Sequence, residues 1–360
     1  MITMLLMLIL MVVFAIVILW GTSYDSKKES IMSMADNTFL RGFWSIIVVL
    51  VHVPQMYQNR IQDMVGSFAY VGVTFFFLAS SFGLKRSITN KPDYISHFWR
   101  RRLPSILMPA LLANALCNVS YCLLGKELNW KAFININPWV KVLLIYYFIF
   151  WLFYAILPKA FGTGWWQDVL IILIVCGISL GGYFTPIKIS KIWIVEPVGF
   201  AYGILVANYA KQIIVWIRKK WFINSLCLMI LSLICGVAYL WFKPVVFYGD
   251  YFLKLVLGIM ITAFIFTLLG KLRVGNKVNF FLGTISYEVY LLHSDIFNII
   301  RFIFETKPID SGLYIIISLT LTIICSAILW WITKLVNTNL IRVLSRWKCL
   351  KLKRERSNIT

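Results

Sequence analysis

Residues 39–54 read FLRGFWSIIVVLVHVP, an apolar run that contains two ionisable residues, Arg41 and His52. An apolar run of about this length can cross most of a bilayer as a helix. Ionisable side chains are costly in hydrocarbon, so they usually face a bundle interior or a water-filled cavity. The chain has only three histidines. The stretch therefore predicts a membrane helix with one polar face.

The rest of the chain is equally apolar. Hydrophobic residues make up 61% of it, charged residues 14%, and its mean hydropathy is +0.83, whereas soluble domains are about a quarter charged. Runs long enough to span recur near 2–20, 40–57, 66–84, 103–124, 138–157, 167–185, 192–209, 222–242, 251–270, 286–304 and 312–333. This pattern predicts an all-α, polytopic membrane helical bundle of ten or eleven transmembrane helices, and it excludes a sizeable soluble domain.

Lysine and arginine set the expected orientation. If the tail after 333 is cytoplasmic, inner segments hold 25 of the 35 basic residues, as the positive-inside rule requires. Eleven spans then place the N-terminus outside. We therefore expect a multi-pass protein of the plasma (inner) membrane with a cytoplasmic C-terminus. The net charge of +21 is explained by this topology and by attraction to anionic membrane lipid, and it does not indicate nucleic-acid binding.

Three parts are expected along the chain: an extra N-terminal transmembrane helix with an inner loop (1–38), a ten-helix core (39–333) and a basic cytoplasmic tail (334–360) resembling a surface-lying helix. The first helix lacks a basic leading region and a cleavage site, which favours a retained anchor over a signal peptide. A start at Met32 or Met34 would instead give ten helices. The seven cysteines form no CxxC pair, so neither a zinc site nor a disulfide framework is indicated.

Arg41 and His52 are eleven residues apart, which is close to three helical turns and about 16 Å of rise. On a helix spanning 40–57, both side chains therefore share one face. This places Arg41 at the cytoplasmic rim and His52 above it near mid-membrane. Spacing alone leaves two interpretations open: an anion-attracting group below a titratable base, or an ordinary inner flank and a structural core histidine.

The tenth predicted helix carries the second histidine of interest, His293, in the segment LGTISYEVYLLHSDIF. We expect His293 to approach His52 from a different helix. A buried imidazole there would suit general acid–base chemistry. Glu288 and Tyr290 precede it and are candidates for the substrate site. Asp295 could orient a base or merely flank a polar cavity.

Arginines stand at the inner end of the fourth helix, at Arg100, Arg101 and Arg102. A triple arginine is an ordinary topology flank, but guanidinium groups also bind phosphate bidentately. Three residues earlier, His97 is expected at the membrane interface rather than in a site. Glu196, near the outer end of the seventh helix, is a further substrate-site candidate. The glycines that follow it, at 199 and 203, have the spacing of closely packed helices.

Four segments together resemble the acyltransferase 3 family of integral membrane acyltransferases. They are the Arg-x10-His pair formed by Arg41 and His52, GVTFFFLASSFGL (72–84), RRRLPSILMP (100–109) and ISYEVYLLH (285–293). The chain departs from the family pattern at Thr74, where an acidic residue is common, and at Ser81, where glycine is common. Ser105 stands where the basic loop usually has a second arginine, which puts that position's anion-binding role in doubt. Residues 39–333 carry the resemblance.

The resemblance implies transfer of an acyl group, most often acetyl, from cytosolic acyl-CoA to a hydroxyl of a cell-surface or lipid-linked polysaccharide. Acetyl-CoA is then the donor substrate, no metal is needed, and Arg41 with Arg100–Arg102 would hold the donor. His52 would deprotonate the acceptor, or carry the acyl group transiently, while His293 polarises or orients. Membrane lipid, the donor, a sugar acceptor and a separate outer-face protein are the partners to expect.

Two alternatives remain open. About eleven helices with a few embedded charges also suit a secondary transporter or a flippase for lipid-linked sugars. A catalytically inactive family member acting as a receptor or scaffold is the third possibility. Dependence on coenzyme A separates the enzyme from the transporter.

Overall fold

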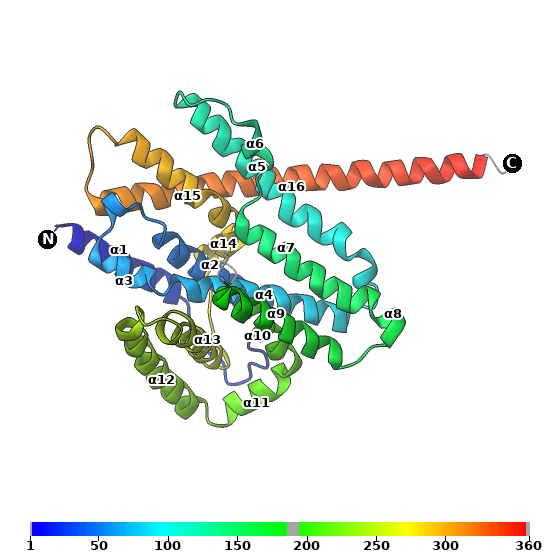
Figure 1. Ribbon diagram of the computed structural model, residues 1–360, viewed down its shortest axis with the longest axis horizontal. Coiled ribbons are helices and arrows are strands. Elements are labelled where there is room, and N and C mark those ends of the chain that lie inside the picture. The colour runs from blue at the N-terminus through cyan, green and yellow to red at the C-terminus, as the bar shows by residue number, and fades with distance from the viewer. Residues whose placement is uncertain (1, 186–193, 358–360) are drawn as a thin grey trace.

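A computed structural model describes residues 2–185 and 194–357, and nearly all of them are helical (Figure 1). The helices are α1 (Ile2–Leu19), α2 (Met34–Leu50), α3 (Arg60–Gly66), α4 (Ala69–Asn90), α5 (Phe98–Leu123), α6 (Trp130–Ile134), α7 (Pro138–Trp151), α8 (Pro158–Phe161), α9 (Trp166–Phe184), α10 (Gly199–Asn208), α11 (Ala210–Lys219), α12 (Trp221–Phe242), α13 (Lys254–Leu269), α14 (Lys277–Thr284), α15 (Ser286–Ile303) and α16 (Ser311–Ser357). One two-stranded antiparallel ladder pairs β1 (Ser23–Tyr24) with β2 (Leu272–Arg273). The all-α, polytopic prediction is confirmed.

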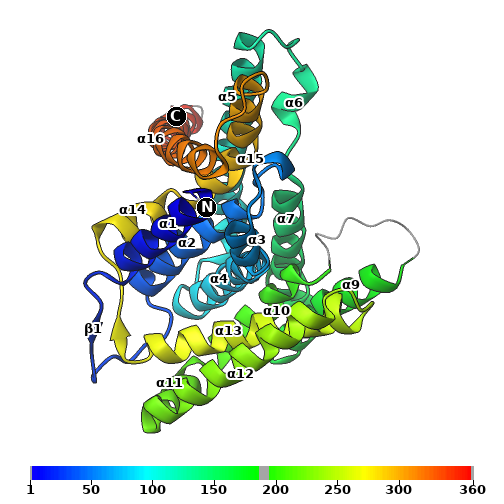
Figure 2. The same cartoon turned by 90° about the vertical axis from the view of Figure 1, so that its left-hand side faces the viewer.

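The helices gather around α2 and α4. In Figure 2, α5, α15 and α16 lie above this pair and α11, α12 and α13 lie below it. The buried apolar residues form two clusters, one mainly from α5, α7, α9, α15 and α16 and the other mainly from α2, α4, α12 and α13. α2 contributes to both clusters, so residues on it are positioned by packing from both sides.

Close packing of α10 on α4 confirms the role expected for the two glycines after Glu196. A Cβ added at Gly199 would lie 2.1 Å from the Thr74 carbonyl oxygen, and one at Gly203 would lie 2.2 Å from that of Leu78. No side chain larger than hydrogen fits at either position. Thr74 and Ser81 are both buried against this contact.

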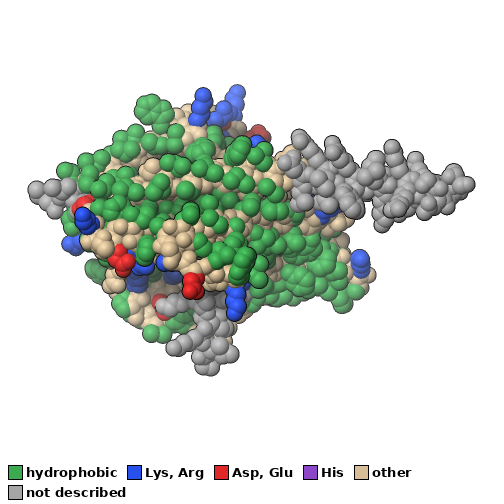
Figure 3. Space-filling view, turned by 90° about the horizontal axis from the view of Figure 1, so that it is seen from above, with side chains coloured by type: hydrophobic (Ala, Val, Ile, Leu, Met, Phe, Trp, Pro, Cys, Tyr) green, Lys and Arg blue, Asp and Glu red, His purple; other side chains and the backbone are tan. Residues whose placement is uncertain are grey.

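Seven described helices are long and apolar enough to cross a membrane, or eight if the pair formed by 196–208 and α11, bent by 76°, counts as one span. Counted by helix length and composition, the described spans are therefore fewer than the ten or eleven transmembrane helices predicted. Helices do occupy the other predicted spans, but α1, α2 and α15 have only 17 or 18 residues. The predicted seventh span began at 192, and residues 192–193 lie outside the described residues. Large apolar side chains cover much of the outer surface (Figure 3), as expected for a protein solvated by lipid.

Segments that the prediction assigns to the inner side do lie together. β1 pairs with β2, and the Arg218 guanidinium donates to the Ser26 carbonyl oxygen. Farther along the same side, Asp168 of α9 accepts from Lys85 of α4 and from Asn208 at the end of α10. The assignment of this side to the cytoplasm stays a prediction.

The division of the chain into three parts stays a prediction, and the structure describes both ends of the chain. α1 is packed into the bundle, since the side-chain amides of Asn276 and Asn279 donate to carbonyl oxygens of its last turn. α16 runs through residue 334 without a break and continues to Ser357 in a single helix. Whether the part from 334 onward lies on the membrane surface stays a prediction.

Candidate active site

Two histidines, one just beyond the end of α2 and one on α15, are in contact. The ring centroids of His52 and His293 are 4.6 Å apart, with the rings inclined by 69°. His293 is 3% exposed, whereas the side chain of His52 is exposed. The expected approach of His293 to His52 is confirmed, and of the two it is His52 that a substrate can reach.

The hydrogen bonds of the two rings are alike and fix their tautomers. Nδ1 of His52 lies 3.0 Å from the Val48 carbonyl oxygen, and Nδ1 of His293 lies 3.0 Å from that of Val289. A carbonyl oxygen can only accept, so each Nδ1 carries the hydrogen and each neutral ring keeps its lone pair on Nε2. Nε2 of His293 is buried without a hydrogen-bond partner among the described residues. The pair therefore offers two basic nitrogens, one accessible and one enclosed.

His52 lies just beyond α2, which corrects the predicted helix of 40–57. A capping box at Ser33 and Asp36 starts the helix near residue 34, well before the apolar run. The helix ends at Leu50, whose carbonyl oxygen accepts from the Gln62 side chain at 2.5 Å. His52 follows in a turn, and its own backbone N–H donates to the Val49 carbonyl oxygen. Its ring is held at the end of a buried helix instead of midway along one.

The earlier start of α2 places Arg41 inside the helix rather than at its first residues, and its position at the cytoplasmic rim stays a prediction. Arg41 stands seven residues inside α2, about 10 Å from the start of the helix. Its guanidinium interacts electrostatically with Glu288 of α15 and with the Tyr147 hydroxyl of α7. It forms no hydrogen bond or ion pair within residues 2–185 and 194–357. Arg41 interacts with Glu288 and His52 contacts His293, so both residues are directed toward α15, but only Arg41 does so from α2 itself.

The three inner arginines are not equivalent. Arg100 and Arg101 are exposed, whereas Arg102 donates from Nε to the Tyr94 hydroxyl at 2.8 Å. Its guanidinium carbon lies 5.8 Å from the ring centroid of Tyr94 and 5.9 Å from that of Tyr147. Ser105, where the family pattern has a second arginine, is exposed and bonds back to the Arg102 carbonyl oxygen.

Tyr147 was not singled out by the sequence, yet it lies between the two partly buried arginines. Tyr147 is 4% exposed, its ring lies close to the Arg102 guanidinium, and it interacts electrostatically with Arg41. On the α15 side, Tyr287 donates to the Ile106 carbonyl oxygen, one turn beyond Arg102. A series of polar groups thus connects Arg102 at one end of α5 with Arg41 in the interior. No local motif could have marked Tyr147, because it is one of 17 tyrosines and its importance depends on contacts with three other helices.

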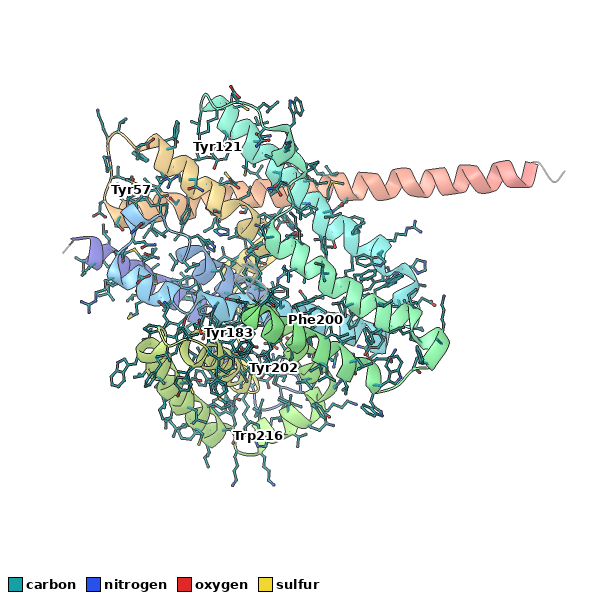
Figure 4. All side chains as sticks on the ribbon, viewed as in Figure 1. Tyr57, Tyr121, Tyr183, Phe200, Tyr202 and Trp216 are labelled. Atoms are coloured by element: carbon teal, nitrogen blue, oxygen red, sulfur yellow. The ribbon has the colours of Figure 1, made fainter. Side chains whose placement is uncertain are left out.

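Three of the other candidates have separate partners. Tyr290 packs its ring 6.0 Å from that of His293 and donates to the Asn137 side chain. Asp295 accepts from Tyr121 of α5 at 3.2 Å, so it does not orient His293. Glu196 forms an ion pair with Lys254 at 2.7 Å. Tyr121 and the α4–α10 side of the bundle are widely separated in Figure 4.

The arrangement suits proton transfer beside a bound anion. An accessible imidazole with a free Nε2 can take a proton from a hydroxyl or attack a carbonyl carbon. Two guanidinium groups near one tyrosine hydroxyl can hold a phosphate-rich ligand. Within the described residues no three His, Cys, Asp or Glu side chains are grouped as metal ligands. His97 is exposed and bonds locally to Ser96.

Comparison with known proteins gives one match. The family profile described as "Acyltransferase domain", that of the acyltransferase 3 family, matches residues 34–331. Its start lies in the first turn of α2 and before the predicted core boundary at 39, and α1 lies outside it. Searches among curated proteins and among solved structures found no match.

Proposed function

Since this chain belongs to the acyltransferase 3 family and is therefore a membrane-bound acyltransferase, we propose that it moves an acetyl group from acetyl-coenzyme A to a hydroxyl of a polysaccharide of the cell envelope. The observation that carries the proposal is the contact between His52 and His293. It presents one accessible basic nitrogen beside a second, enclosed one.

In the proposed reaction, Nε2 of His52 removes the proton from the acceptor hydroxyl. The oxygen then attacks the thioester carbonyl, the carbon–sulfur bond breaks, and the thiolate leaving group takes up the proton. In a variant, Nε2 of His52 attacks the thioester first and carries the acetyl group to the hydroxyl. His293 touches the His52 ring rather than an open space, so we assign it a positioning role.

The donor's phosphates would be held by arginine. Arg102 has one hydrogen bond, to Tyr94, and Arg41 has none among the described residues, so both guanidinium groups keep donors for an anion. A cation without a hydrogen-bonded anion in a bundle interior is costly, and a phosphate would reduce that cost. Exposed Arg100 and Arg101 would attract the same ligand from the aqueous side. Because coenzyme A is cytosolic, this proposal puts the arginine-rich end of α5 and the C-terminus in the cytoplasm.

The decisive experiment supplies labelled acetyl-coenzyme A to membrane vesicles that contain the protein. We expect label in the glycan fraction together with release of free coenzyme A, and mass spectrometry of envelope glycans from cells with and without the protein should show one missing acetyl substituent. A vesicle preparation that transports a lipid-linked sugar without consuming acetyl-coenzyme A would instead establish a transporter or flippase. If the vesicles neither consume acetyl-coenzyme A nor transport a sugar, a scaffold would be favoured.

A further inference from the structure

A helix outside the proposed active site leaves the direction of the bundle. α11 follows α10 after a bend of 76° at a break of one residue. If α10 runs along the membrane normal, α11 therefore runs close to the membrane plane. Figure 4 shows Trp216 of α11 at the outer edge of the bundle. In-plane helices at a bilayer surface are recognised by a buried face and a basic, aromatic outer face.

α11 has such faces. Ile214 and Ile217 are buried, and Ile217 packs against Gly270 at the end of α13. The opposite face exposes Lys211, Lys219 and neighbouring apolar residues, with Val215 67% and Trp216 55% exposed. An exposed tryptophan next to lysines is poorly suited to water. The headgroup region of a bilayer accommodates both the indole ring and the ammonium groups.

The charge around α11 is of one sign. Between Glu196 and Asp250 the sequence contains no acidic residue, while it has four basic residues from 211 to 220. Arg218 is directed to the Ser26 carbonyl oxygen, which ties α11 to the β1–β2 side. There Lys271 lies 5.9 Å from the ring centroid of Trp221, so the basic surface continues past the helix.

The β1 side has three described acidic residues, Asp25, Glu29 and Asp36, and two of them are already paired: Asp36 with Lys28 and Asp25 with Arg273. Asp25 accepts from Arg273 at 2.7 Å. The backbone hydrogen bond from Lys27, with Arg273 beside it, lowers the pKa of Asp25 below its ordinary value. Asp25 therefore stays ionised and paired with Arg273, and the lysines of α11 have no acidic partner among the described residues.

We infer that α11 is an in-plane docking surface for anionic phospholipid headgroups, bound by Lys211, Lys219 and Lys220 with Trp216 at the level of the glycerol backbone. Lipid is the occupant that the charge favours, because each lysine near an anionic bilayer adds attraction that uncharged headgroups do not provide. Asn208, the last residue of α10, donates a hydrogen bond to Asp168 and lies two residues before α11. A headgroup bound to α11 would therefore also restrict the motion of the end of α10. The inference does not depend on the proposed reaction.

The test compares lipid binding by the full chain and by a variant with Lys211→Gln, Lys219→Gln and Lys220→Gln. Native mass spectrometry in detergent would measure binding of phosphatidylglycerol and phosphatidylcholine at equal concentrations. We expect preferential binding of phosphatidylglycerol by the unaltered protein, about a tenfold loss in the variant, and weakening by salt. Added inorganic phosphate or coenzyme A should not displace the lipid.

The matched control removes three exposed lysines elsewhere, with Lys131→Gln, Lys243→Gln and Lys307→Gln. It changes the net charge equally and should keep the preference. Thermal midpoints in phosphatidylcholine show whether each variant is folded, and only the unaltered protein and the control should gain stability from phosphatidylglycerol. An equal loss in both variants, no loss in the α11 variant, or displacement by phosphate would overturn the inference.

Discussion

Two charged clusters in the bundle are built in opposite ways. Around Glu196, the carboxylate meets Lys254 at 2.7 Å and the ammonium lies 4.9 Å from the Tyr70 ring centroid. Around His52, by contrast, His293 keeps an unpartnered Nε2, and Arg41 has no hydrogen bond within the described part of the chain. Both clusters attracted attention in the sequence, because both hold ionisable groups inside apolar segments.

The difference teaches which buried charges belong to the architecture. A paired charge has its cost in apolar surroundings offset inside the protein, so it needs nothing else. An unpaired ionisable group beside other ionisable groups is a candidate for contact with a ligand. By this criterion Glu196 and Lys254 join helices, whereas Arg41, His52 and His293 are the groups that the proposed reaction would use.

Replacing the accessible histidine should give the largest effect. His52→Ala removes the free Nε2 that would act on the hydroxyl, so we expect acetyl transfer to fall by about a hundredfold to ten-thousandfold. Stability should change little, because the side chain is exposed. The measurement is labelled acetyl transfer at equal protein level, with His97→Ala as the control. Near-normal transfer by His52→Ala would remove the histidine pair from the mechanism.

Breaking the paired cluster should change stability instead of catalysis. Glu196→Gln leaves the Lys254 charge without its partner, and we expect the free energy of unfolding to fall by about 3 kcal/mol. Adding Lys254→Met should restore most of it. Unfolding in detergent checks this, while transfer per folded molecule should be unchanged. If transfer were lost at normal stability, Glu196 would belong with the active site after all.

A smaller effect should separate two neighbouring tyrosines on α7. Tyr147→Phe removes the hydroxyl between Arg41 and Arg102 and keeps the ring, so we expect KM for acetyl-coenzyme A to rise about threefold to tenfold with little change in kcat. Tyr146→Phe is the control, because the buried Tyr146 hydroxyl has no hydrogen-bond partner among the described residues. Equal effects of the two changes would mean that Tyr147 has no special relation to the donor.

Local sequence was a good guide where the deciding interaction is also local. Apolar runs gave the helices, and the 199/203 glycine pair gave a close helix contact that the structure confirms. Hydropathy failed at both ends of α2: the start is set by the local Ser33–Asp36 capping box, which precedes the apolar run, and at the other end the Leu50 carbonyl oxygen accepts from the Gln62 side chain. As a result, Arg41 lies well inside the helix and His52 lies beyond its end, instead of both lying within a helix of 40–57.

Roles that depend on partners far along the chain were the hardest to predict. Asp295 follows His293 by two residues, which points it to another side of α15, where Tyr121 binds it. The position of Tyr147 beside Arg41 and Arg102 depends on how α2, α5 and α7 pack together, so the sequence alone could not predict it.

The sequence by itself determined that this chain is a polytopic helical membrane protein and which few residues carry ionisable chemistry into it, because hydropathy and charge are properties of each residue. The tertiary structure alone decided which of those residues are neutralised and which are left free. That outcome depends on partners brought by other helices, as with Lys254 for Glu196 and His293 for His52. Their meeting is governed by the packing of the whole bundle, which no single segment encodes.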